Sequence, residues 1–125
     1  IRALRELLEK SPDNVQARQK LAFCLLQVNE LGESVREFRK ILRQKQEDNF
    51  TVLYLGLALA KQGDTDRAAT CWREYFNINH PVIQREVNLQ LSLYDNGVAE
   101  AEDMARSIEE AIREQSRTGH SEQGE

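Results

Sequence analysis

The chain of 125 residues and 14.4 kDa is 40% hydrophobic and 30% charged, and its formal net charge is −4. This composition is that of a single globular domain and excludes disordered and collagen-like chains. No apolar run approaches the roughly 20 residues of a transmembrane helix, which excludes a membrane span within this chain.

The same residue types recur at an interval of 34 positions. Five of the recurring sets are apolar, and the last consists of asparagine and glycine. The sets are Leu4, Phe38 and Trp72; Leu7, Ile41 and Tyr75; Leu8, Leu42 and Phe76; Leu21, Leu55 and Leu89; Leu25, Leu59 and Leu93; and Asn29, Gly63 and Gly97. Agreement of all these sets in one register indicates an internal structural repeat rather than chance.

Each repeat is predicted to be a helical hairpin, with a helix A, a tight turn and a helix B. The apolar positions follow the i, i+3, i+4 spacing of a buried helix face, and a lone hairpin cannot bury that face, so we expect hairpins to stack. The domain of 1–115 is expected to comprise helix B of a truncated repeat at 1–11, full repeats at 15–48 and 49–81, and an irregular repeat at 82–115. Residues 116–125 lack apolar periodicity and are predicted to form a mobile polar tail.

The turns between helices A and B are predicted at Asn29, Gly63 and Gly97. Glycine, and next best asparagine, is favoured where the residue after a helix adopts the left-handed conformation. Side chains that can accept a hydrogen bond from the first turn of a helix precede two of the helices. They are Asp13 or Asn14 before the helix A of 15–48, and Asp64 or Asp66 before the helix B of 49–81.

This pattern resembles the tetratricopeptide repeat family. The residues that carry the resemblance are Leu55, Gly56, Leu59, Gly63, Asp64, Ala68, Trp72 and Tyr75 in 49–81, and Leu21, Ala22, Leu25, Ser34, Phe38 and Ile41 in 15–48. Two departures are Ser34, where the family has alanine, and Ala101, which comes one position early and predicts a shorter last turn. The resemblance implies an all-α fold, an α-α superhelix (solenoid) of antiparallel helix hairpins with about three repeats.

The chain carries no motif of an enzyme or of a metal site. Cys24 and Cys71 have no zinc-ligand spacing and are interpreted as buried or half-buried free thiols. Cys71 and His80 are expected on one helix, where the rise alone separates them by about 13 Å and excludes a catalytic dyad. Carboxylates such as Glu109 and Glu110 are interpreted as a solvated helix face. We therefore predict no enzyme activity, no catalytic residue, no cofactor and no metal.

The net acidic charge argues against nucleic-acid binding, although the charge is unevenly distributed. Residues 1–45 carry 10 Lys and Arg against 6 Asp and Glu, whereas residues 99–125 carry 3 against 8. One helix B has a basic side that we interpret as a solvated convex face, with phosphates or an acidic partner as alternatives. Its residues are Arg36, Arg39, Lys40 and Arg43.

Free cysteines favour a reducing compartment, so we expect a cytoplasmic protein. Because the first residue is Ile1 rather than methionine, we also expect the chain to be a fragment of a longer protein. A periplasmic location, or a membrane anchor in a preceding segment, stays open.

In the tetratricopeptide repeat family, the concave surface formed by helices A usually holds an extended peptide or a partner helix. The positions that match this protein-binding groove are Gln19, Phe23, Leu26, Phe50, Leu53, Tyr54, Leu57, Leu91 and Tyr94. All but the first are apolar or aromatic, and the helix A of 49–81 is apolar almost all round. Such a helix is normally buried on every side, and an uncovered side would form an exposed apolar patch.

Four coverings of this apolar surface stay open. They are a partner's peptide or amphipathic helix, a second copy of the chain, the chain's own helix at about 99–115, and the neighbouring helices A. The resemblance implies a non-catalytic protein–protein interaction module, such as a scaffold, an adaptor or a chaperone-like protein. The alternative is a structural module that forms homo-oligomers. One variant of the family grips a C-terminal carboxylate, but the matching positions carry no cation here, so we expect no binding of that kind.

Overall fold

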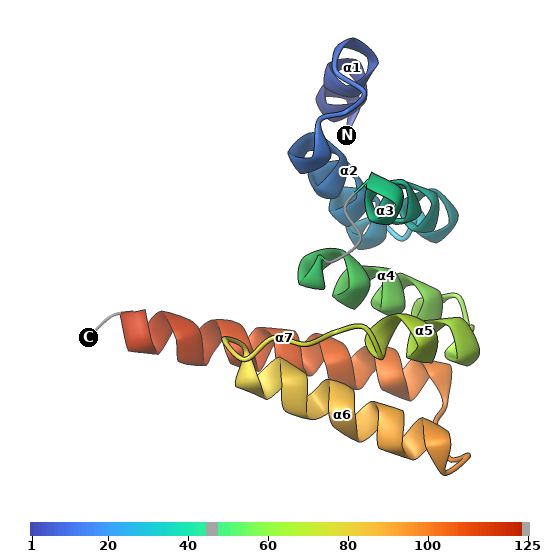
Figure 1. Ribbon diagram of the computed structural model, residues 1–125, viewed down its shortest axis with the longest axis vertical. Helices are drawn as coiled ribbons and strands as arrows, with labels where there is room; N and C mark the ends of the chain where they lie inside the picture. Colours follow the sequence, from blue (N-terminus) through green and yellow to red (C-terminus); the bar gives the residue numbers. More distant parts are fainter. Residues whose placement is uncertain (45–47, 124–125) are drawn as a thin grey trace.

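The structure, a computed structural model, describes residues 1–44 and 48–123, with side chains up to Thr118. This described part contains no strand. Its helices are α1 (Arg2–Lys10), α2 (Val15–Gln27), α3 (Leu31–Gln44), α4 (Asn49–Lys61), α5 (Thr65–Trp72), α6 (Pro81–Asp95) and α7 (Ala101–Gln123). They stack from α1 at one end of the molecule to α6 at the other (Figure 1). The predicted all-α fold is confirmed. Within the described ranges, every helix is too short or too polar to cross a membrane.

The turns that follow α2, α4 and α6 share one geometry. Asn29, Gly63 and Gly97 have φ values of 66°, 87° and 75°, as the sequence predicts. In each turn the next N–H donates to the carbonyl five positions back, at 2.8 to 3.0 Å, which satisfies a carbonyl at the helix end. The last connection is longer than the others, because α7 begins only at Ala101. The predicted shorter last turn is therefore wrong.

Two of the candidate caps hold the first turn of a helix. The Asn14 side chain accepts a hydrogen bond from the N–H of Ala17 at 3.0 Å, at the start of α2. The Asp64 side chain accepts one from the N–H of Arg67 at 3.0 Å, at the start of α5. Each cap satisfies a donor that has no partner inside the helix.

The helices of each hairpin approach each other closely at small residues. Trp72 is fully buried against Gly56, and its indole N–H donates to the Leu53 carbonyl at 3.1 Å. A Cβ atom on Gly56 would lie 2.3 Å from that indole nitrogen, so the position accepts no larger residue. In the preceding hairpin, the buried Ser34 hydroxyl donates to the Ala22 carbonyl at 2.8 Å. This bond explains how serine replaces the alanine of the family pattern without leaving a buried polar group unpaired.

Helix α5 ends one residue after Cys71, so the prediction that Cys71 and His80 share one helix is wrong. Residues 73–80 form an irregular connection to α6 instead. The Asn49 side chain holds its backbone, because it donates to the Phe76 carbonyl at 2.7 Å and accepts from the Phe76 N–H at 3.1 Å. These hydrogen bonds satisfy the backbone groups of Phe76, which would pair within the helix if α5 were longer.

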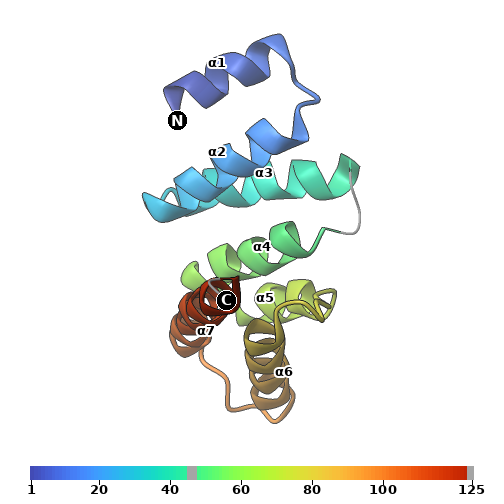
Figure 2. The same cartoon turned by 90° about the vertical axis from the view of Figure 1, so that its left-hand side faces the viewer.

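The last four helices close into a ring. Helix α7 packs against both α4 and α6, and α6 packs against α5, which pairs with α4 (Figures 1 and 2). Helix α7 therefore lies on the side of α4 that the next helix A would cover in a regular stack. Its Met104 and Ile108 are fully buried and share one apolar core with Leu57 of α4. The chain's own C-terminal helix thus covers part of the apolar surface of α4.

Helix α6 buries a different side from the one that the repeat pattern predicts. Ile83, Val87 and Gln90 are buried, whereas Leu89 is 51% exposed and its repeat equivalent Leu55 is 2% exposed. The prediction that Leu89 is a core residue is therefore wrong. Since α6 packs against α5 and α7 in the ring, it turns its 83–87–90 side inward.

Helix α7 continues to Gln123, beyond residue 115 where the last repeat is predicted to end. Gln115 is buried, and its side-chain carbonyl accepts hydrogen bonds from the N–H groups of Val82 at 2.7 Å and Ile83 at 3.3 Å. It thereby satisfies donors at the start of α6 and fixes α7 against α6. The predicted mobility of the tail stays a prediction, and residues 124 and 125 lie outside the described residues.

Candidate functional site

A cleft of about 450 Å³ lies between α2, α4 and α7. Its lining residues are Phe23, Leu26 and Gln27 of α2, Tyr54, Leu57 and Lys61 of α4, and Glu109, Ile112 and Arg113 of α7. Both α2 and α7 pack against α4, which therefore links the two walls. The volume falls within the range of about 300 to 1,000 Å³ that ligand-binding pockets occupy.

Three aromatic rings form a cluster at this cleft. The ring centroids of Phe23 and Tyr54 lie 5.1 Å apart in an edge-to-face arrangement, and those of Phe50 and Tyr54 lie 4.7 Å apart. Phe50 and Tyr54 share one face of α4 because they are four positions apart, and Phe23 reaches them from α2. Phe50 is 40% exposed and the other two rings are half-buried. We call Phe23, Phe50 and Tyr54 the aromatic cluster.

The aromatic cluster is chemically apolar in spite of its one hydroxyl. Burial raises the pKa of Tyr54 above its ordinary value, so this side chain stays uncharged at neutral pH. Phe23 and Tyr54 pack edge-to-face, a geometry that aromatic pairs prefer, and the other two ring pairs are tilted by 47° and 48°. The cluster therefore offers an apolar surface rather than a reactive group.

Three of the four leucines predicted to line the groove belong to the core beneath it. Leu26, Leu53 and Leu57 are all buried, and Leu57 is only 3% exposed. Tyr54 packs against this core, and Leu26 and Leu57 offer little free surface although they line the cleft. The Gln19 side-chain amide donates to the Asp48 carboxylate, which also accepts from the Thr51 hydroxyl at 2.8 Å.

The structure separates the two predicted groove residues of α6 from the others. Leu91 is half-buried against the main core, and the Tyr94 hydroxyl donates to the Asp66 carboxylate of α5. Both therefore lie where α6 meets α5. They are absent from the cleft because α7, not α6, lies beside α4 there.

The residues of α7 in the cleft were not identified from the sequence. Met104, Ile108 and Ile112 follow one another at intervals of four, which marks an apolar helix face but not its partner. In the structure that face meets α4, and the neighbouring Glu109 carboxylate pairs with the Lys61 ammonium at 3.2 Å. This ion pair joins α4 and α7 at the edge of the cleft.

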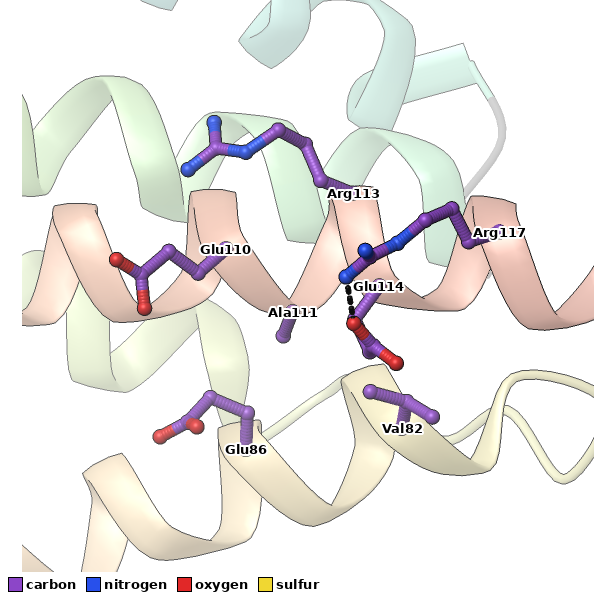
Figure 3. A pocket seen from close by; sticks show the side chains of 7 residues that line it. All are labelled: Val82, Glu86, Glu110, Ala111, Arg113, Glu114 and Arg117. Atoms are coloured by element: carbon purple, nitrogen blue, oxygen red, sulfur yellow. Dashed lines mark hydrogen bonds and ion pairs between the residues drawn. The ribbon is translucent and has the colours of Figure 1, made fainter.

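A second hollow, of about 370 Å³, lies between α6 and α7 (Figure 3). Its lining residues are Val82, Glu86, Glu110, Ala111, Arg113, Glu114 and Arg117, and the last two charged side chains pair with each other. Charged side chains of both signs line it together with Val82 and Ala111, whereas aromatic side chains line the first cleft.

The described residues contain no group of three or more histidine, cysteine, aspartate or glutamate side chains that could hold a metal ion. Burial raises the pKa of Cys71, which lowers the population of the nucleophilic thiolate. The His80 ring nitrogen Nδ1 lies 3.2 Å from the side-chain nitrogen of Asn77, within hydrogen-bond distance.

A family model described as tetratricopeptide repeat matches residues 1–52. This range covers α1, α2 and α3 and the first residues of α4. No curated protein and no solved structure matches the chain. Repeats of this family generally mediate protein–protein interaction and are typically non-catalytic. The family match over residues 1–52 and the helical hairpins that it covers support the resemblance of the chain to tetratricopeptide repeat proteins.

Proposed function

We propose that the chain is a non-catalytic scaffold or adaptor that binds an apolar peptide or amphipathic helix of another protein in the cleft between α2, α4 and α7. The aromatic cluster is the observation that supports this most, because its rings are packed together yet partly open to solvent. Aromatic side chains that are already ordered lose little conformational entropy on binding and are common anchors of interfaces.

The size of the cluster limits what apolar burial alone can contribute. Complete burial of one aromatic side chain contributes about 2 kcal/mol. Since Phe50 is 40% exposed and the other rings are half-buried, the cluster can add about 2 kcal/mol in total. A micromolar Kd requires about 8 kcal/mol. The partner's own apolar side chains and the polar edge of the cleft must supply the rest.

Replacement of Tyr54 by alanine tests this function. Peptides that bind the full chain are first selected from a displayed library of random sequences, and their Kd is measured by fluorescence anisotropy. Tyr54→Ala is expected to weaken binding about 30-fold, as loss of a central aromatic anchor does. Since Tyr54 is only half-buried, we expect the free energy of unfolding in urea to fall by about 1 to 2 kcal/mol, which leaves the chain folded.

Leu89→Ala is the matched control, because it also removes exposed apolar surface but lies on α6, outside the cleft. It should leave the Kd unchanged. Equal losses of affinity in both variants, or a library that yields no binding peptide, would contradict the proposed function. Leu57→Asp is unsuitable as a binding variant, since Leu57 is 3% exposed and a buried carboxylate would unfold the chain.

A second candidate function is self-association. Leu7 of α1 is 42% exposed and Leu89 of α6 is 51% exposed, and these helices lie at opposite ends of the molecule (Figure 1). Their repeat equivalents Ile41 and Leu55 are almost completely buried. Light scattering at several concentrations distinguishes the two functions. A mass that grows with concentration favours self-association, and a constant monomer mass excludes it.

The cytoplasmic location expected from the sequence belongs to this proposal. Cys24 and Cys71 are both free and half-buried, and free thiols persist in reducing compartments.

A further inference from the structure

Two cations in or beside the cleft between α2, α4 and α7 lack an anionic partner among the described residues. Arg113 of α7 lines both the cleft and the hollow between α6 and α7; it is exposed and makes no ion pair or hydrogen bond with a described residue. Lys20 of α2 is exposed and likewise unpaired within that part of the chain. Because it precedes Phe23 by three positions, Lys20 lies on the same face of α2 as the aromatic cluster.

The carboxylates that border the cleft are already engaged. Glu109 pairs with Lys61 at 3.2 Å. Asp48 accepts hydrogen bonds from Gln19 and Thr51. Two cations, Lys61 and Arg113, and one carboxylate, Glu109, line the cleft, which leaves one positive charge in excess next to its apolar surface, although the chain as a whole is acidic.

The orientation of Arg113 directs its charge into this cleft. Figure 3 shows Arg113 projecting from α7 toward α4. A guanidinium group presents a planar set of donors that matches a carboxylate with two parallel hydrogen bonds. Fully exposed ion pairs contribute little, but a pair beside a desolvated apolar surface is less screened by water.

We propose that this cleft selects acidic peptides, in which an apolar or aromatic side chain packs on the aromatic cluster and a neighbouring aspartate or glutamate pairs with Arg113. A further carboxylate of the peptide, on the other side of its apolar residue, pairs with Lys20. This proposal rests on the proposed function, because it names the chemistry of the partner that the same cleft binds. The ion pairs would add a polar contribution to the free energy of binding, which the limited exposed area of the aromatic cluster cannot supply alone.

The test uses peptides selected from a displayed random library against the full chain, with the Kd measured by fluorescence anisotropy. We expect aspartate and glutamate to be enriched over lysine and arginine within a few positions of the apolar anchor. Arg113→Gln should weaken binding about tenfold, and Arg113→Glu should weaken it further and shift a repeated selection toward basic peptides. The affinity of the unmodified chain should fall as the salt concentration rises, and that of Arg113→Gln should fall less.

Arg117→Glu is the matched control. Arg117 lies one turn further along α7, pairs with Glu114 and lines the hollow between α6 and α7, as Arg113 also does, but it does not line the cleft. The Arg117→Glu variant should leave both the Kd and the charge of the selected peptides unchanged. Peptides without acidic enrichment, or equal affinity for Arg113→Glu and the unmodified chain, would overturn the proposal while loss of binding in Tyr54→Ala still supported the proposed function. Failure to select any binding peptide would overturn both.

Discussion

Gly56→Ala is expected to lower the free energy of unfolding by about 3 kcal/mol. The added Cβ would lie 2.3 Å from the indole nitrogen of Trp72, and the other near atoms belong to the same ring. Trp72 is fully buried, so the ring cannot move away without disturbing the core that joins α4 and α5. A shift of the ring would also break the hydrogen bond to the Leu53 carbonyl. Urea denaturation followed by tryptophan fluorescence measures the loss.

Gly32→Ala provides the control for this substitution. Gly32 also lies in a helix, but its added Cβ would meet only the Arg36 guanidinium, at 3.7 Å. Alanine is a better helix former than glycine, so this variant should be more stable by about 0.5 to 1 kcal/mol. Similar changes in both variants would show that the close approach of Trp72 to Gly56 does not determine stability.

Leu55→Ala and Leu89→Ala are expected to differ widely although they occupy the same position in two repeats. Leu55 is 2% exposed, and its truncation should cost about 2 to 5 kcal/mol through lost burial and the cavity left behind. Leu89 is 51% exposed, and its truncation should cost less than about 1 kcal/mol. Urea denaturation of both variants gives the comparison. Equal losses would mean that α6 buries the side predicted by the repeat pattern.

The local parts of the fold could be predicted from the sequence because they depend on neighbouring residues. Asn29 and Gly63 mark left-handed turns, since few other residues adopt a positive φ without strain. The spacing of apolar residues identified the helices, and the interval of 34 positions identified the hairpins. Each of these signals acts within one hairpin or between adjacent ones.

The position of α7 could not be predicted in the same way. The Met104 and Ile108 side chains form an apolar helix face that suits either α4 or α6, and the sequence does not state which helix is its partner. In the structure this face packs into the core next to Leu57. The rotation of α6, which exposes Leu89, follows from that choice of partner.

The proximity of the aromatic side chains could be predicted where it depends on helix spacing. Phe50 and Tyr54 lie on one face of α4 and meet Phe23 of α2, as their family positions imply. Leu91 and Tyr94 lie elsewhere, because their prediction assumed that α6 continues the stack beside α4. Identification of the α7 residues would have required the three-dimensional arrangement of the ring.

Amide chemical-shift mapping of the isotope-labelled full chain, titrated with a selected peptide, tests the location of the binding surface most directly. Shift changes are expected to concentrate at Phe23, Tyr54, Leu57 and Ile112, which line the cleft. Arg39, on the exposed side of α3, should show no change. Changes that concentrate on α3, or at the ends of the molecule in α1 and α6, with the cleft unaffected, would contradict the proposed site.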